Sequence, residues 1–197
     1  MTPKQIERVQ KKIKAIRKAI YDEKRLWGGY HDGRGLRYVP PQYYLKIQDY
    51  KGGMTYFRWF NKNFPDDGGA PEFLLEWTIV LFKNGKLKDA ETKAIQTYFA
   101  NEYLFDKFFE RPIIPLEQHE DSDLYKIKFA EDMVYAHNQP ELTEFAAWLA
   151  NVEQSERFKK IALKYLWLIK TLKSKTDREE RSYLSRQIYQ LRDGRLL

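Results

Sequence analysis

Apolar side chains in this sequence recur at the spacing of an amphipathic helix, and this periodicity limits the folds open to the chain. Near the amino terminus the apolar positions are separated by three, four, three and four residues, at Ile6, Val9, Ile13, Ile16 and Ile20. This spacing places them on one narrow face of a helix, which is suited to packing against another helix. No segment alternates apolar and polar residues as a half-buried strand does. The pattern predicts an all-α fold.

Capping residues and helix breakers indicate where the helices begin and end. A first helix is expected to begin at the capping signature of Thr2, Pro3 and Gln5 and to stop at Gly28-Gly29. Further helices are expected over 42–51, 54–63, 72–84, 86–101, 102–109, 122–137, 141–152 and 155–174. In this interpretation Gly52-Gly53 breaks the chain between two of them, and 111–121 is the longest loop. A capping box over 176–179 begins a last helix, which carries Tyr183, Leu184, Ile188 and Leu191.

Composition excludes several classes of protein. The chain has 197 residues, of which 43% are hydrophobic and none is Cys. Collagen-like and wholly disordered classes, disulfide frameworks and Cys-ligated metal sites are therefore excluded. The longest apolar runs, such as 78–82, are too short to span a membrane, and the first residues lack the apolar stretch of a secretory signal. We expect a cytoplasmic, single-domain protein with a helix and Gly-rich loop over 1–36, helical hairpins over 37–152 and further helices over 153–197.

Positive charge is concentrated at the two ends of the chain. Residues 1–27 hold nine Lys and Arg against three acidic residues, and residues 153–197 hold twelve against six, whereas the middle is acidic. Two basic ends are typical of a surface that attracts nucleic acid or an acidic partner. They are equally typical of the solvated faces of amphipathic helices, which is the interpretation that we favour.

An internal repeat links two stretches of the chain at an offset of 37 residues. Superimposing 48–50 on 85–87 places Tyr44 over Leu81, Gly53 over Ala90 and Phe57 over Ala94. Each stretch then has a helix, a short turn and a second helix, with a small residue where the two helices approach closely. The unit resembles the tetratricopeptide repeat, whose period is about 34 residues. The resemblance covers roughly 37–152, with extra residues at 68–70, and makes 122–152 a degenerate third unit.

Resemblance to the tetratricopeptide-repeat family implies a right-handed stack of helical hairpins, an α-solenoid, capped by the amphipathic helices at its ends. It also implies a concave groove formed by the first helix of each pair. The groove positions carried over are Tyr38, Gln42, Leu45, Lys46, Glu72, Leu75, Ile79, Phe82 and Lys83. Of these we expect Gln42, Lys46, Ile79 and Lys83 to be exposed, because their helices turn Tyr44, Trp77 and Leu81 inward. Val39 and Glu76 stand where some family members place the Asn pair of a carboxylate clamp, so that device is not expected here.

Residues capable of catalysis or metal binding do not form a recognisable motif. The three histidines, His31, His119 and His137, lack zinc-hydrolase spacing, and His137 is expected to end a helix. Asp66-Asp67 is expected to form a turn, and the acidic residues of 117–123 to cap a helix. The Gly-rich loop over 28–35 lacks the ending of a P-loop, although Arg34 and Arg37 beside Tyr30 and Tyr38 are suited to holding an anion. We therefore expect no catalytic residue, cofactor or metal, an enzyme site near His31, Arg34 and His119 being the weakest option.

Aromatic residues interleaved with basic ones occur over 56–60 and 164–167. Such a pattern suits stacking against nucleic-acid bases, but at helical spacing we assign these side chains to the core. The sequence thus predicts a non-enzymatic helical-repeat scaffold that binds a protein or peptide partner. The alternative is a nucleic-acid-associated protein that uses its basic terminal helices.

Overall fold

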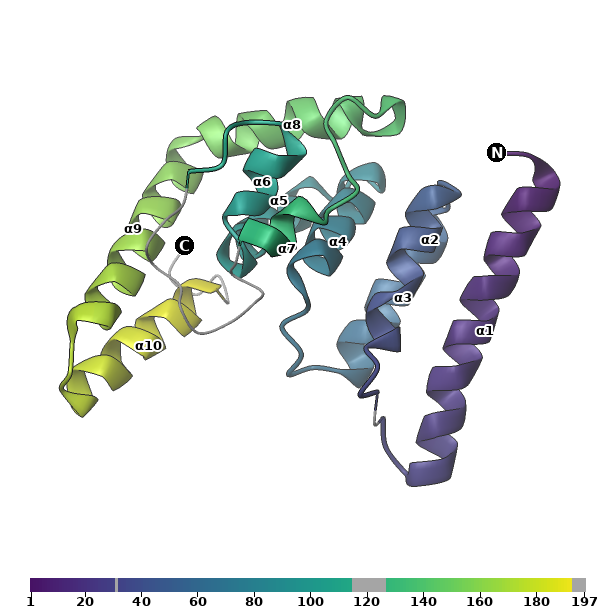
Figure 1. Cartoon of the computed structure of the whole chain (residues 1–197), viewed down its shortest axis with the longest axis horizontal. Helices are drawn as coiled ribbons and strands as arrows, with labels where there is room; N and C mark the ends of the chain where they lie inside the picture. Colours follow the sequence, from purple (N-terminus) through teal and green to yellow (C-terminus); the bar gives the residue numbers. More distant parts are fainter. Residues whose placement is uncertain (31, 115–126, 193–197) are drawn as a thin grey trace. The chain divides into compact units, whose positions relative to one another are not determined.

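The computed structural model describes residues 1–30, 32–114 and 127–192 (Figure 1). Every element of regular secondary structure in these ranges is a helix, which confirms the predicted all-α class. The chain divides into two compact units, Met1–Ala90 and Glu91–Leu197. Among the described residues, no helix is long and apolar enough to cross a membrane.

Helix α1 (Pro3–Trp27) begins and ends where its caps predict. The Thr2 side chain accepts a hydrogen bond from the Gln5 amide, while the Thr2 amide donates to the Gln5 side chain at 2.8 Å. Gly28 then ends the helix in the left-handed conformation, with φ of 71°. Val9, Ile13 and Ile20 are buried, and α1 packs against α2 (Pro40–Lys46).

The first unit continues through a short 3-10 helix, η1 (Leu36–Tyr38), to α2, α3 (Tyr50–Asn63) and α4 (Pro71–Lys83). The predicted break at Gly52-Gly53 is wrong, because both glycines lie in the first turn of α3. The chain reverses earlier, and the Asp49 side chain caps α3 by accepting from the Gly52 amide at 2.9 Å. A Cβ atom at Gly53 would lie 3.1 Å from Val80 and 3.5 Å from Tyr44. Gly53 is therefore required for close packing rather than for a turn.

The 37-residue offset holds for the turn between the two helices of each pair. Helix α2 ends at Lys46 and α4 ends at Lys83, while α3 begins at Tyr50 and α5 (Leu87–Ala100) begins at Leu87. Gly53 and Ala90, which the offset pairs, are both buried. The two halves thus share the position of the turn and the 14-residue length of the second helix, whereas α2 has 7 residues and α4 has 13.

Aromatic rings fill the core of the first unit between α3 and α4. Phe57 stacks on Trp77 with ring centroids 4.6 Å apart, and Phe60 packs on Phe73 at the same distance. Tyr56 is fully buried, and its hydroxyl donates to the carbonyl oxygen of Arg37 at 2.6 Å. These contacts tie η1 to α3 and confirm that the aromatic run over 56–60 contributes to the core.

The second unit contains the rest of α5 and the helices that follow it. These are α6 (Tyr103–Phe108), α7 (Ile127–Glu131), the 3-10 helix η3 (Pro140–Leu142), α8 (Thr143–Gln154), α9 (Glu156–Ser174) and α10 (Arg178–Arg192). Helix α9 packs against both α8 and α10, and Figure 1 shows α9 and α10 meeting at the short connection over 175–177. Helical spacing over 155–174 predicts one apolar face of Phe158, Ile161, Tyr165, Leu168 and Leu172, of which the first four are buried in α9 and Leu172 is half-buried.

Three predictions for this unit need correction. The helix expected over 122–137 is helical only over Ile127–Glu131 among its described residues, so the described stretch 132–137 is not helical as predicted. His137 does not end a helix, because its amide donates to the Phe108 carbonyl at 2.9 Å instead of to a preceding turn. The cap of α10 is Asp177 rather than Thr176, since the Asp177 side chain accepts from the Glu180 amide at 2.9 Å.

Candidate functional site

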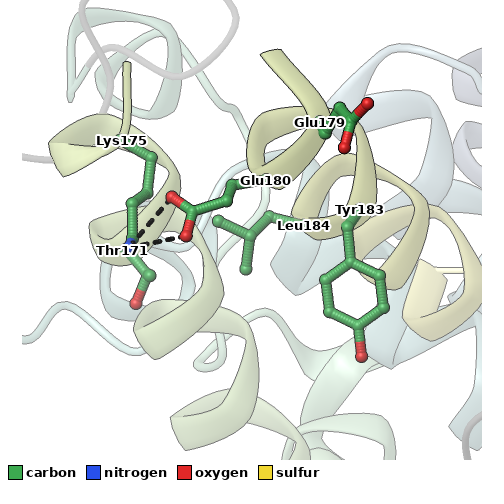
Figure 2. A pocket seen from close by; sticks show the side chains of 6 residues that line it. All are labelled: Thr171, Lys175, Glu179, Glu180, Tyr183 and Leu184. Carbon is green, nitrogen blue, oxygen red and sulfur yellow. Dashed lines mark hydrogen bonds and ion pairs between the residues drawn. The ribbon is translucent and has the colours of Figure 1, made fainter. Parts of the chain in front are cut away.

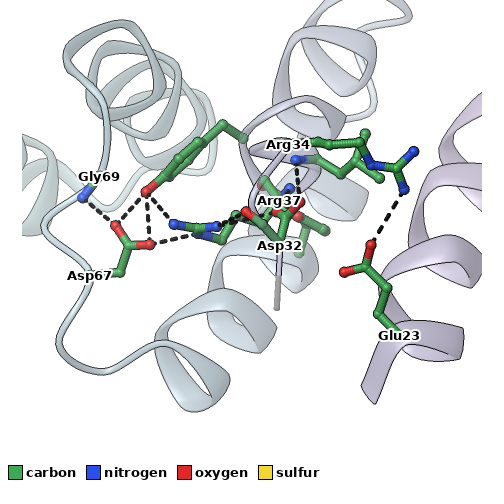
Figure 3. A network of polar contacts seen from close by, with 9 residues as sticks. Glu23, Asp32, Arg34, Arg37, Asp67 and Gly69 are labelled. Atoms are coloured by element: carbon green, nitrogen blue, oxygen red, sulfur yellow. Dashed lines mark hydrogen bonds and ion pairs between the residues drawn. The ribbon is translucent and has the colours of Figure 1, made fainter. Parts of the chain in front are cut away.

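A network of charged and aromatic side chains surrounds Arg37 in the first unit (Figure 3). The Arg37 Nε atom donates to Asp67 at 2.6 Å, and its Nη1 atom donates to the Asp32 carbonyl oxygen at 2.9 Å. The Asp32 carboxylate, whose side chain is fully buried, also accepts from the Leu36 and Arg37 amides, each at 2.7 Å. Tyr38 completes the network by donating to Asp67 at 2.7 Å.

The protonation states within this network follow from its contacts. Burial raises the pKa of Asp67, but hydrogen bonds from Tyr38, the Gly69 amide and Arg37 outweigh burial, so that the net pKa lies below its ordinary value. Burial, together with the hydrogen bond to the Asp67 carboxylate, raises the pKa of Tyr38 to about 12. At neutral pH Tyr38 is therefore a neutral donor beside an ionised Asp67.

The anion site predicted at Arg34 and Arg37 is not formed. Arg37 is already paired with two carboxylates, those of Asp32 and Asp67. Arg34 is 71% exposed and pairs with Glu23 at 3.3 Å. A hollow of about 550 Å³ is lined by Arg37 and residues 63–68. The charge of Arg37 is already neutralised by Asp32 and Asp67, so the hollow offers no free cation from Arg37. The network stabilises the fold, and Asp67 forms the expected turn by accepting from the Gly69 amide at 2.9 Å.

The predicted groove positions fall into three groups, which are buried, exposed and half-buried. Leu45, Leu75 and Ile79 are buried, with Leu75 and Ile79 at 0% exposure, so the expectation that Ile79 is exposed is wrong. The reason is that α4 is apolar almost all round, and such a helix is buried on all sides. Gln42 and Lys46 are exposed, whereas the others are half-buried: Tyr38, Glu72, Phe82 and Lys83.

The expected inward positions are largely confirmed. Tyr44 and Leu81 are each 6% exposed, and Trp77 is half-buried against Phe57. The groove therefore lacks an exposed apolar centre. Its most accessible members are two polar side chains on α2.

A surface that sequence reasoning missed lies on α9. Leu163 is 68% exposed and Trp167 is 60% exposed, whereas the neighbouring Tyr165 is fully buried. The assignment of Trp167 to the core is therefore wrong. Phe158, Ile161, Tyr165 and Leu168 already occupy the inward face, and a residue two positions from Tyr165 points away from it. The four-residue spacing of Leu163 and Trp167 was the signal available in the sequence.

Lysines surround this apolar pair. Lys159 and Lys160 lie one helical turn before Leu163, and Lys170 lies about one turn after Trp167. All three are exposed, and none forms an ion pair with another residue in the described part of the chain. We call Lys159, Lys160, Leu163, Trp167 and Lys170 the α9 outer face. It combines an apolar centre with a positively charged margin.

A second hollow, of about 350 Å³, lies between α9 and α10 (Figure 2). It is lined by Thr171, Lys175, Glu179, Glu180, Tyr183 and Leu184. The Lys175 ammonium contacts both carboxylate oxygens of Glu180, at 3.2 and 3.0 Å. The single lysine of the hollow is thus neutralised, and Glu179 makes the hollow acidic.

The other residues considered for catalysis or metal binding do not form a metal-binding group among the described residues. His31, His119 and the acidic residues of 117–123 lie outside the described residues. Within the described ranges no group of three His, Asp or Glu side chains is placed to hold a metal ion. His137 is half-exposed, with its Nε2 atom 3.5 Å from Glu110. Comparison of the chain with protein-family models, curated proteins and solved structures finds no match.

Proposed function

We propose that this protein is a non-enzymatic helical scaffold that binds an acidic protein or peptide partner through the α9 outer face. The observation that carries the proposal is the exposed pair Leu163 and Trp167, enclosed by three lysines. Protein interfaces commonly have an apolar centre within a polar rim, and Trp is enriched among the residues that dominate binding. The lysines favour a partner whose own rim is acidic.

The repeat supports the scaffold part of this proposal. The end of α2 and both ends of α3 recur in α4 and α5 at an offset of 37 residues, with a small residue at equivalent places. We infer a tetratricopeptide-like stack from this recurrence and from the resemblance of the sequence. In such a stack α9 and α10 serve as a terminal cap, and the exposed face of a cap is free for a partner.

The α9 outer face is a better candidate than the groove. The exposed groove positions, Gln42 and Lys46, have no exposed large apolar neighbour on α2. Burial of apolar area is the main favourable term in protein association. Lys46 and Lys83 supply charge but no apolar anchor, whereas α9 supplies both.

Pull-down from native lysate, with and without nuclease, tests the proposal. Leu163→Ser with Trp167→Ser should abolish capture of proteins that the wild type retains after nuclease treatment. Lys46→Glu with Lys83→Glu, on the groove, should leave capture unchanged, as should Lys173→Glu with Lys175→Glu outside the α9 outer face. Loss of capture only in the groove variant would restore the groove as the binding site. Loss of every captured protein on nuclease treatment would contradict a protein partner.

A further inference from the structure

The solvent-facing side of α1 carries a continuous row of cations. Lys4, Arg8, Lys11, Lys14, Lys18 and Arg25 are all exposed and follow one another at helical spacing. We call these six residues the α1 outer face. At a rise of 1.5 Å per residue, the 25-residue helix is about 37 Å long. The row is therefore an extended stripe rather than a local cluster.

Most of this charge is available to a ligand. Lys4, Arg8 and Lys14 form no ion pair with any residue in the described part of the chain. Lys11 pairs with Glu7 at 2.8 Å, but both side chains are more than half exposed, and such pairs are weak and readily exchanged. Lys18 pairs with Asp22, whose side chain is only 31% exposed, so Lys18 is less available than Lys4, Arg8 and Lys14. The stripe therefore keeps a net positive charge along its length.

Two other cations of α1 contact aromatic rings of neighbouring helices. Lys12 lies 5.8 Å from the ring centroid of Tyr43, and Arg17 lies 5.9 Å from that of Tyr56. Both rings belong to helices of the same unit, so these side chains contribute to packing of α1. The α1 outer face is thus distinct from the cations that hold the helix in place.

The composition of the stripe identifies the kind of partner. Between Lys4 and Lys18 the only exposed apolar residue of this helix is Ala15, and its exposed large apolar residues, Tyr21, Leu26 and Trp27, lie toward its carboxyl end. A protein interface needs an apolar centre, and a membrane-surface helix needs a free apolar face, but Val9, Ile13 and Ile20 are buried. A nucleic-acid backbone, by contrast, is bound through cations alone.

We propose that the α1 outer face binds the phosphate backbone of double-stranded nucleic acid without reading its sequence. From Lys4 to Arg25 the stripe is about 32 Å long at 1.5 Å per residue, slightly less than one turn of a duplex, which rises about 34–36 Å. A single strand is a poorer fit, because its binding relies on aromatic side chains for base stacking, and the exposed aromatic residues of α1, Tyr21 and Trp27, lie only near its carboxyl end. This inference concerns a different helix from the proposed protein-binding face and does not depend on it.

Fluorescence anisotropy with a labelled 20-base-pair DNA duplex of random sequence tests the inference. The wild-type protein should bind, and the logarithm of its association constant should fall against log salt with a slope of roughly −3 to −5. The triple variant Lys4→Glu, Arg8→Glu, Lys14→Glu should bind at least about tenfold more weakly, with a slope smaller by roughly 3. Circular dichroism should show an unchanged fold, since an acidic residue near the start of a helix is favourable.

The matched control is Lys159→Glu, Lys160→Glu, Lys170→Glu, which changes the charge of α9 by the same amount. It should leave DNA affinity within about twofold, apart from the small effect of net charge. Absence of duplex binding by the wild type at 50 mM salt, or equal losses in the two triple variants, would overturn the inference. Tighter binding to a 20-nucleotide single strand, or to polyglutamate, would show that the stripe serves a different ligand. The Leu163→Ser, Trp167→Ser variant should bind DNA normally, which separates this test from that of the protein-binding face.

Discussion

The Nε atom of Arg37 donates a hydrogen bond of 2.6 Å to the Oδ2 atom of Asp67 and so joins η1 to the turn that precedes α4. Only 21% of the Arg37 side chain and 16% of the Asp67 side chain are exposed. Removing one member of such a pair leaves the other charge poorly solvated. The contact is therefore a determinant of stability in the first unit.

Replacement of Asp67 by Asn should destabilise the protein at pH 7. We expect the free energy of unfolding, measured by urea denaturation, to fall by about 1–3 kcal/mol, because Arg37 and Tyr38 lose a charged acceptor. Asp66→Asn is the matched control, since Asp66 is exposed and should change stability by less than about 0.5 kcal/mol. Equal effects of the two substitutions would contradict the assigned role of Asp67.

Because the pKa of Asp67 is shifted in the folded protein, we expect the stability of the protein to depend on pH. The pKa of Asp67 is lower in the folded protein than its ordinary value, because hydrogen bonds outweigh burial. Its contribution to stability is thus fully present above the unfolded pKa of about 3.9 and is lost as the pH falls through the folded pKa. The difference in unfolding free energy between wild type and Asp67→Asn should shrink below about pH 5. A difference that stays constant down to about pH 2 would disprove the coupling.

Gly52→Ala should destabilise the first unit, although Ala is the better helix former. A Cβ atom at this position would lie 2.2 Å from the Asp49 carboxylate and 2.7 Å from the Tyr44 ring. The substitution would displace the cap of α3, and loss of a cap costs about 1 kcal/mol. Thermal unfolding should show a lower Tm. Gly68→Ala, with nothing within 4 Å of the new Cβ, should leave the Tm unchanged or raise it.

Ala90→Arg should cost several kcal/mol, because Ala90 is fully buried and the position has no room for a charged side chain. Leu87→Arg on the same helix is the control, since Leu87 is 49% exposed and should tolerate the change. Denaturation midpoints of the two variants measure the difference. A midpoint for Ala90→Arg equal to that of the wild type would show that the repeat alignment of Gly53 and Ala90 has no structural meaning.

Tyr165→Phe tests the packing of the second unit. The buried Tyr165 hydroxyl donates to the Phe99 carbonyl at 3.0 Å and lies 3.1 Å from an Arg192 nitrogen that donates to it. Loss of this group should lower stability by about 1–2 kcal/mol. Tyr189→Phe, whose side chain is 69% exposed, should have no measurable effect. Comparable losses in both variants would argue against a specific role for the buried hydroxyl.

The candidate surfaces could be predicted from the sequence only in part. The excess of cations over 1–27 and 153–197 was visible, but not which of them remain free. Arg37 was a reasonable anion-binding candidate until the structure placed Asp32 and Asp67 against it. Asp67, 30 residues from Arg37, neutralises its charge without leaving a local signal in the sequence.

Local sequence determined the all-α class, the start and end of α1, the buried face of α9 and the repeat spacing. Caps and helical periodicity act between residues at most a few positions apart, so they can be recognised in a single stretch of chain. Tertiary structure alone decided that Gly53 packs against Val80, that Ile79 is buried and that Trp167 is exposed. Each outcome depends on which neighbouring element occupies a given helix face, and the competition for that face is settled only when the elements pack together.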